Sequence, residues 1–469
     1  MPAVLRLLSV LLVTCIALGA QAKPLTLPEL IARARANDHR VKEAQAQLRY
    51  FRARYDEAKW AWFPKLDSYF LVAGPTPEAR NDGLGGAPTT KATTMYDLDF
   101  GQPGVMMGAG ADAVLPIYTF GKLDALEEAG RQGVEAGIAL HTRAQDEAEY
   151  QVSQAFYGYS VARSIITVID DTSKRLDDAE KTLNRLRTEN SGQVTQMDVY
   201  KLSFYRQQAE VQRVQAENGA GFALAAIRLL VAAAPDEIID VAAEDLSSMP
   251  EGQLAPLDSL IVRAAEHRPE LKAIAAGLLA REQEVKIREA MYYPDFGIAG
   301  FFKWRWTTSA TRQYSPFAYD PYNELNAGVG LVMRYQWDFP HKSIELEKAR
   351  AEYEKMEHQR NLIAGGVKLE LEKAYGETTL AFAKASKQGE AEKQARRWAT
   401  SAFAAFELGT GDTRELVDSF SAYAQASAMK VQALYELQLG LRSLTRSVGQ
   451  PVSLETRPVT APPSMLKPK

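Results

Sequence analysis

Residues 295–306 read DFGIAGFFKWRW, and residues 325–339 read LNAGVGLVMRYQWDF. Nearly every second position in each stretch is apolar or aromatic, which is the period of a β-strand with one apolar face. A strand that crosses a membrane needs ~9–11 residues and commonly ends in aromatic side chains. The two stretches therefore predict a transmembrane β-hairpin at about residues 295–339. Its expected lipid-facing and aromatic-belt side chains are Phe296, Ile298, Phe302, Trp304, Trp306, Tyr335 and Trp337.

A weaker alternation over residues 65–73 and 107–117 predicts an equivalent hairpin at about residues 65–117. A soluble β-sandwich with one buried face is the alternative, because the same alternation permits it. The gathering of Trp and Tyr at the strand ends favours the membrane. The intervening stretches 74–106 and 307–324 are rich in Gly, Pro, Asn and Ser and are expected to form long external loops.

The first 22 residues predict a signal peptide. Arg6 precedes an apolar run, Leu7–Leu18, and Ala20-Gln21-Ala22 offers the small residues that signal peptidase accepts, so cleavage is expected after Ala22. The run is shorter than the ~20 residues of a transmembrane helix. Lipidation of Cys15 is a further alternative. If Ala22 is the cleavage point, the mature exported chain contains no cysteine and has neither a disulfide nor a Cys-based metal site.

The remaining sequence contains an internal duplication. Leu27–Ala34 matches Leu257–Ala264 at an offset of 230 residues, and later positions match at offsets near 220, such as Ala129 with Ala349. A period of this size indicates a tandem duplication. The expected division is a first repeat at 23–235, a linker at 236–256, a second repeat at 257–452 and a Pro-rich tail at 453–469.

Each repeat also predicts helices of unusual length. Residues 27–60 are periodic and end before Pro64, and no proline interrupts the heptad-like pattern from Leu123 to about Glu189. About 65 helical residues would extend ~100 Å. The second repeat predicts the same from Ile344 to about Leu408, followed by a leucine-rich return helix. On periodicity alone, an extended coiled-coil rod is the alternative.

Four strands cannot close a barrel, and each unpaired backbone group at an edge inside a bilayer costs several kcal/mol. Three chains supply twelve strands, and their coiled helices would continue the same wall. The predicted fold class is therefore mainly α with a membrane β-barrel, in which a long coiled-coil α-helical barrel is continuous with a trimeric 12-stranded β-barrel.

The composition excludes several functions. The 55 basic and 59 acidic residues give a net charge of −4, without the basic excess typical of nucleic-acid binding. The five histidines lack metal-ligand spacing, and neither a Gly-rich phosphate loop nor a nucleophile elbow occurs. We therefore expect no enzyme activity, metal, cofactor or nucleic-acid partner.

The ordered set of motifs resembles the TolC-type outer-membrane efflux family over residues 25–452. The set comprises the duplication, the helix-to-strand junctions at Pro64 and Pro294, the strand-to-helix junction LPIYTFGK at 115–122, and the Gly-x5-Asp and Gly-x6-Asp hairpins that end at Asp198 and Asp418. The resemblance implies a homotrimer in the outer membrane of a Gram-negative cell, extending into the periplasm. It also implies an export duct, for efflux or type I secretion, joined by a periplasmic adaptor to an inner-membrane pump of the RND, ABC or MFS type.

The turns between the long helices are the expected functional positions, near 190–195 and 409–414. Glycine permits the φ > 0 of such turns, and Thr or Asp caps the returning helix. The resemblance implies that the tips dock the adaptor. The docking candidates are Gly192, Thr195, Gly409, Gly411 and Thr413.

The resemblance further implies that acidic side chains near the tips, Asp198 and Asp418, ring a constriction. Such a ring would attract cations and resist anions. Arg414 matches a basic tip residue, and we predict an Arg414–Asp198 latch, with an ordinary solvated helix pair as the alternative. The transported substrate is not specified by the sequence. The competing function is a periplasmic coiled-coil adaptor or structural protein with a soluble β domain.

Overall fold

The computed structural model describes residues 24–80, 89–90, 102–188, 195–244, 246, 248–315, 317, 319–408 and 410–454. The predicted signal peptide with Cys15 and Ala22, the tail beyond residue 454, and the tip residues Gly192 and Gly409 lie outside the described residues. The predictions for these segments stay predictions.

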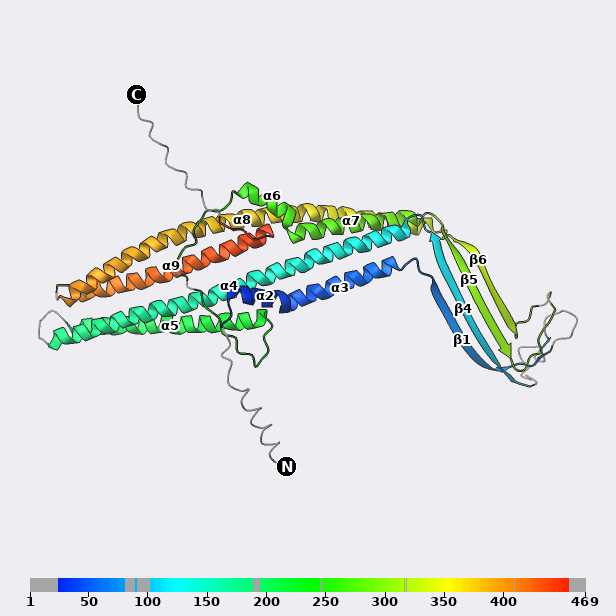
Figure 1. Cartoon of the computed structure of the whole chain (residues 1–469), viewed down its shortest axis with the longest axis horizontal. Coiled ribbons are helices and arrows are strands. Elements are labelled where there is room, and N and C mark those ends of the chain that lie inside the picture. The colour runs from blue at the N-terminus through cyan, green and yellow to red at the C-terminus, as the bar shows by residue number, and fades with distance from the viewer. Residues whose placement is uncertain are drawn as a thin grey trace, which may run out of the picture. The chain divides into compact units, whose positions relative to one another are not determined.

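The same order of elements occurs twice (Figure 1). The first series is α2 (Leu27–Asn37), α3 (His39–Lys59), β1 (Lys65–Thr76), β4 (Gly104–Tyr118), α4 (Lys122–Thr188) and α5 (Gln196–Leu230). The second is α6 (Leu257–His267), α7 (Pro269–Ala290), β5 (Asp295–Thr307), β6 (Glu324–Arg334), α8 (Phe339–Glu407) and α9 (Thr413–Val448). Short strands β2 (Ala79–Arg80) and β3 (Thr89–Thr90) pair with each other in the first loop. The helix-rich fold class with an antiparallel sheet is confirmed.

The helix expected over residues 27–60 is interrupted, which corrects the prediction. Asp38 is extended at ψ 134°, and its carboxylate accepts the Arg40 backbone N–H at 2.8 Å, so it ends α2 and caps the start of α3. In the second repeat, Arg268 is extended at ψ 121° between α6 and α7. Pro269 explains that break, because a residue that precedes proline avoids helical geometry.

The second hairpin is shorter than expected. Strand β6 ends at Arg334, so Tyr335 and Trp337 lie in the connection to α8 rather than in a strand. Their rings meet edge to face at 4.8 Å, and the Lys342 ammonium lies 4.1 Å from the Tyr335 ring centroid. This local cluster turns the chain out of the sheet and into α8, which begins five residues before the expected Ile344.

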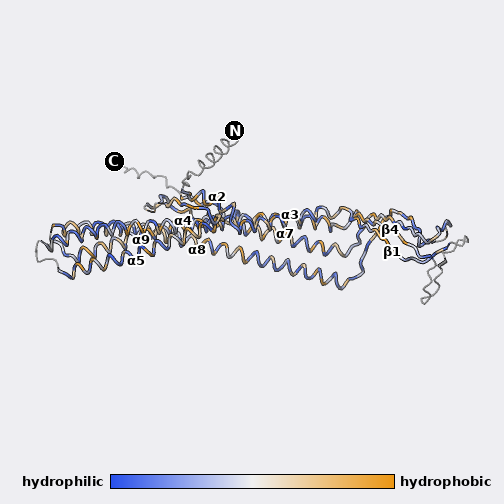
Figure 2. The backbone as a smooth tube through the Cα atoms, turned by 90° about the horizontal axis from the view of Figure 1, so that it is seen from below, coloured by the Kyte–Doolittle hydropathy of each residue, from blue (hydrophilic) through white to orange (hydrophobic). Residues whose placement is uncertain are grey.

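Two compact units cut across the repeats. One comprises Met1–Leu48, Gly137–Ala273 and Asn361–Lys469, and the other comprises Arg49–Ala136 and Ile274–Arg360. Each unit therefore combines segments of both repeats. Hydrophilic and hydrophobic residues alternate along the long helices (Figure 2). Among the described residues, no helix is both long and apolar enough to cross a membrane.

The second unit contains a four-stranded antiparallel sheet in the order β1-β4-β5-β6. The register places Phe302 opposite Ala111 on one side and Ala327 on the other, so period-two positions of all strands share a face. That face is apolar apart from Ser68. It carries Leu66, Ser68, Phe70, Val72, Met107, Ala109, Ala111, Ala113, Leu115, Ile298, Gly300, Phe302, Trp304, Trp306, Leu325, Ala327, Val329, Leu331 and Met333.

The opposite, polar face of the sheet carries its charged residues, among them Asp67, Asp112, Lys303 and Arg305, together with glycines and some apolar side chains such as Leu71 and Phe301. Aromatic rings lie over some of these glycines: a Cβ on Gly110 would come within 2.4 Å of the Tyr69 ring. The glycine is therefore required by the close approach of the ring from the neighbouring strand.

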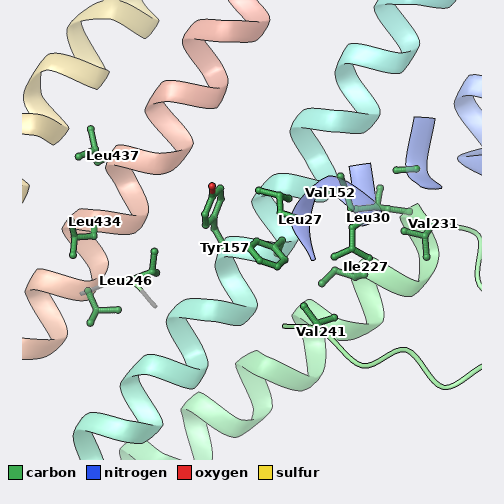
Figure 3. Close-up of a cluster of buried hydrophobic side chains, with 14 of the residues drawn as sticks. Leu27, Leu30, Val152, Tyr157, Ile227, Val231, Val241, Leu246, Leu434 and Leu437 are labelled. Carbon is green, nitrogen blue, oxygen red and sulfur yellow. The ribbon is translucent and has the colours of Figure 1, made fainter. Parts of the chain in front are cut away.

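The first unit has a core where α2, α4, α5, α9 and the inter-repeat linker meet (Figure 3). Leu30, Val152, Ile227 and Leu437 are among its fully buried side chains. The linker is held to the start of the first repeat by a parallel bridge, in which the Leu25 N–H donates to the Asp240 carbonyl at 2.9 Å. This core anchors the four long helices whose far ends form the tips.

Candidate functional site

The tips of the two long helical hairpins pack against each other. Their shared core contains Leu176, Ala179 and Leu183 of α4, Leu202 of α5, Ala399 and Phe406 of α8, and Leu416, Val417, Phe420 and Tyr423 of α9. Side chains from all four helices interlock there, which fixes the position of each returning helix. The first turns of α5 and α9 thus lie on one surface.

The start of α5 is a capping box. The Asp198 carboxylate accepts the Thr195 backbone N–H at 2.8 Å and the Thr195 hydroxyl at 2.7 Å, while the Thr195 side chain caps the third helical N–H. Asp198 is buried. In the single chain this carboxylate therefore stabilises the helix start, because it satisfies donors that would otherwise lack a partner.

The start of α9 uses a different cap. Asp412 accepts the Arg414 backbone N–H at 3.2 Å, and the Ala405 carbonyl accepts the Gly411 N–H at 2.9 Å. A Cβ on Gly411 would lie 2.8 Å from the Phe406 nitrogen, so glycine is required by the tightness of the turn. Thr413 is buried in the single chain, where its side chain packs inside the tip, and its role in docking stays a prediction.

Arg414 and Asp418 lie together on the exposed side of α9. The Arg414 Nε is 3.7 Å from Asp418 Oδ2, and the Arg414 side chain is 77% exposed. The predicted Arg414–Asp198 pair does not occur within the described chain, in which Arg414 pairs with Asp418 and Asp198 Oδ2 caps the start of α5. That latch stays a proposal for contacts between subunits.

A groove between α5 and α9 brings further residues to the same surface. Its volume is about 640 Å³, and it is lined by Met197, Tyr200, Lys201, Phe204, Tyr205, Arg414, Val417 and Asp418. Met197, Tyr200 and Phe204 are more than 60% exposed. These three residues are not among the site residues predicted from the sequence. Their spacing of three and four would have revealed an apolar stripe on α5.

The stripe continues along α5 beyond the tip. Val211, Val214, Phe222 and Leu229 are all at least half exposed, at heptad-like spacing. Such a seam is typical of a coiled-coil helix that lacks its partner. Among the described residues, no group of His, Cys, Asp and Glu is arranged to hold a metal ion.

The predicted lipid-facing residues of β5 lie where the alternation places them. Phe296, Ile298, Phe302, Trp304 and Trp306 share the apolar face, and Leu325, Val329, Leu331 and Met333 of β6 continue it with 61–87% exposure. Both β1 and β6 are edge strands of the sheet. A large exposed apolar face with two open edges marks a surface made for lipid or for further protein.

The fold and these surfaces define a duplicated protein of long helical hairpins joined to an antiparallel sheet with one apolar face. Residues 260–450 match the family model of outer membrane efflux proteins. No curated protein sequence matches the chain.

Several solved structures share the fold. The outer-membrane channel OprN is 18% identical, with a TM-score of 0.72 over 90% of this chain and 89% of that one. VceC of Vibrio cholerae is 15% identical, with a TM-score of 0.69 over 91% and 96%. The MtrE outer-membrane channel of Neisseria gonorrhoeae, in its open state, is 14% identical, with a TM-score of 0.72 over 90% and 89%.

The resemblance to TolC-type outer-membrane efflux proteins is thereby confirmed: the second repeat matches the family model, and the described chain has the fold. This is a family of channels. Its match and the fold support an outer-membrane export duct that extends into the periplasm.

Proposed function

We propose that the chain is one subunit of a homotrimeric outer-membrane channel that conducts substrates from an inner-membrane pump to the cell exterior. The observation that carries the proposal is the four-stranded sheet, which has one apolar face and two open edges. At an open edge within a bilayer, each unpaired backbone N–H or C=O group costs several kcal/mol. Three copies joined edge to edge would remove every such edge and turn the polar face inward.

The exposed seam of α5 supports the same assembly. Its apolar side chains need a partner helix, and a neighbouring subunit supplies one at the spacing that a helical barrel requires. The tip groove with Arg414 and Asp418 would remain at the periplasmic end. We propose that the apolar wall of this groove on α5, together with Thr195 and Gly411, docks a periplasmic adaptor. Arg414 and Asp418 on its α9 wall, with Asp198 of a neighbouring subunit, would form the gate.

Membrane fractionation with heat-dependent gel mobility tests the proposal. The full chain, expressed with its own leader, should appear in the outer-membrane fraction as a heat-dissociable trimer. Purified protein should open ion-conducting channels in planar bilayers. Recovery only in the soluble periplasm would contradict the channel and favour the adaptor-like alternative.

Arg414→Ser tests the gate. We expect a severalfold higher conductance, since the substitution removes a cation that could hold neighbouring tips together. Lys387→Ser is the matched control: Lys387 is also exposed and pairs within its own helix, 3.5 Å from Glu390 on α8, away from the tip. A conductance equal to that of the wild type would remove Arg414 from the gate.

A further inference from the structure

The two hairpins of the sheet have the same strand register as well as a duplicated sequence. Strands β1 and β5 begin at Lys65 and Asp295, which are 230 residues apart, whereas β4 and β6 are related by 220 residues. Applying these two offsets to the β1–β4 pairs, from Lys65↔Val114 to Ala73↔Met106, reproduces the β5–β6 pairs from Asp295↔Arg334 to Lys303↔Asn326. The duplication therefore preserved the pairing residue by residue.

The joint between the repeats is formed by β4 and β5. Ala111 lies opposite Phe302 and Ala113 opposite Gly300. Where these strands adjoin the helices, Lys122 Nζ lies 2.7 and 2.8 Å from the two Asp295 carboxylate oxygens. The Phe120 ring stacks on the Tyr293 ring there, with 4.8 Å between the ring centroids. This joint shows how a β4-type strand pairs with a β5-type strand.

Each edge strand of the sheet corresponds, in the other repeat, to one of the two strands in that joint. Edge strand β6 is the equivalent of β4, and edge strand β1 is the equivalent of β5. We propose that β6 of one subunit pairs with β1 of the next in the register of the β4–β5 joint. The two offsets convert Ala111↔Phe302 into Leu331↔Val72 and Ala113↔Gly300 into Met333↔Phe70. This inference rests on the trimeric assembly proposed above.

The derived register keeps the two faces of the sheet separate, because both offsets are even and each strand keeps its alternation. A slip by one residue would place apolar-face side chains against polar-face ones. Leu331, Met333, Val72 and Phe70 instead all belong to the apolar face of the sheet. The new pairs therefore continue one apolar surface around the assembly and keep the polar face continuous on the other side.

The charges at the copied joint are compatible with this register. The equivalents of Lys122 and Asp295 are Lys342 and Lys65, which cannot form an ion pair. The Lys342 ammonium, however, is buried against its own Tyr335 ring at 4.1 Å. Asp338 is the equivalent of Tyr118, whose partner Phe296 is adjacent to Asp295. Lys65 of the next subunit would therefore meet Asp338 in place of a second lysine.

Disulfide trapping in the full-length protein tests the register. Directly opposed residues of antiparallel strands have Cα atoms ~4.5–5.5 Å apart, within reach of a disulfide, whereas diagonal neighbours at ~7–8 Å are too far. The sole cysteine of the sequence is Cys15, in the predicted signal peptide, and single-cysteine variants report any background. Four double variants use the same four positions, so the positions serve as their own controls.

Val72→Cys with Leu331→Cys, and Phe70→Cys with Met333→Cys, should give covalent dimers and trimers on non-reducing gels. Phe70→Cys with Leu331→Cys, and Val72→Cys with Met333→Cys, should remain monomeric after denaturation. If the trimer assembles but the second two pairs cross-link as well as or better than the first two, or if none cross-links, the register is overturned. If no trimer assembles even in the wild type, the proposed function itself has failed.

Discussion

Asp146 shows how burial of one carboxyl sets a pH dependence. It lies on α4 within a charged cluster and faces Arg35 of α2, Arg268 and Glu270 near the start of α7, and Glu149 on its own helix. Burial raises the Asp146 pKa to about 6, against the opposing attraction of Arg35, whose Nη2 is 3.8 Å from the carboxylate. Ionisation of Asp146 is therefore less favourable in the folded protein than in the unfolded chain.

The pH dependence of stability follows from the difference in proton binding between the folded and the unfolded state. Between pH 3.8, where an aspartate side chain ordinarily titrates, and about pH 6, the folded state binds more protons than the unfolded state, so the stability contributed by this group falls as pH rises through that window. Asp146→Asn removes the ionisation. We expect the variant to have a higher Tm than the wild type at pH 7.5 and a smaller difference at pH 5, measured by thermal denaturation. An equal difference at both pH values would contradict the assignment.

Asp198 illustrates which features of the tip could be predicted from residue types and which could not. Thr195-x-x-Asp198 is a capping-box spacing, so the cap itself was accessible from the sequence. Its consequence for the latch was not, because only the structure shows that one carboxylate oxygen accepts both Thr195 donors. A residue assigned to a pore by resemblance is thus already engaged within its own helix.

Among the elements, the start of α7 is joined to α8 and α9 by one buried side chain. Arg268 is 4% exposed, its Nη1 donates to the Arg446 carbonyl at 2.7 Å, and it pairs with Glu370 and with Glu270. Arg268→Ala removes the buried hydrogen bond to the Arg446 carbonyl, while Glu370 keeps Arg446 and Glu270 keeps Arg143 as partners. A buried polar group left without its partner typically costs about 1–3 kcal/mol. Arg268→Ala should therefore lower the Tm substantially.

Arg143→Ala is the matched control for Arg268→Ala. Arg143 also pairs with Glu270, at 3.1 Å, but its side chain is 60% exposed. An exposed pair contributes about 0–1 kcal/mol, so this variant should denature close to the wild type. Equal losses in the two variants would show that burial is not what makes Arg268 important.

Element types were predictable where a single period dominated. Alternation placed the β5 residues on one face, and prolines marked the ends of α3 and α7. The interruption of the helix at Asp38 could not be predicted, because the hydrophobic period continues across it. The break depends on a local hydrogen bond from the Arg40 backbone N–H to the Asp38 carboxylate. The tip groove was missed because the exposure of Met197, Tyr200 and Phe204 depends on which face of α5 its neighbours leave bare.

At the scale of the whole molecule, the two faces of the sheet must meet different surroundings in the channel. Val329 and Gly330 are consecutive in β6, so they lie at nearly the same depth, but they belong to the apolar and the polar face respectively. Val329 is 81% exposed, and a Cβ on Gly330 would meet nothing within 4 Å. The pair thus permits the same substitution on each face without a steric clash at the Cβ.

Val329→Lys should cost about 2–4 kcal/mol in a membrane strand, because the ammonium would enter the hydrocarbon near its middle. Gly330→Lys places the same charge in the aqueous lumen and should leave assembly nearly intact. The measurement is the fraction of heat-dissociable trimer in the outer membrane at equal expression. In a soluble sandwich, Val329 would pack against protein and its substitution would instead destabilise a monomer in the periplasmic fraction. Loss of trimer in Gly330→Lys with an intact Val329→Lys would reverse the assignment of the two faces.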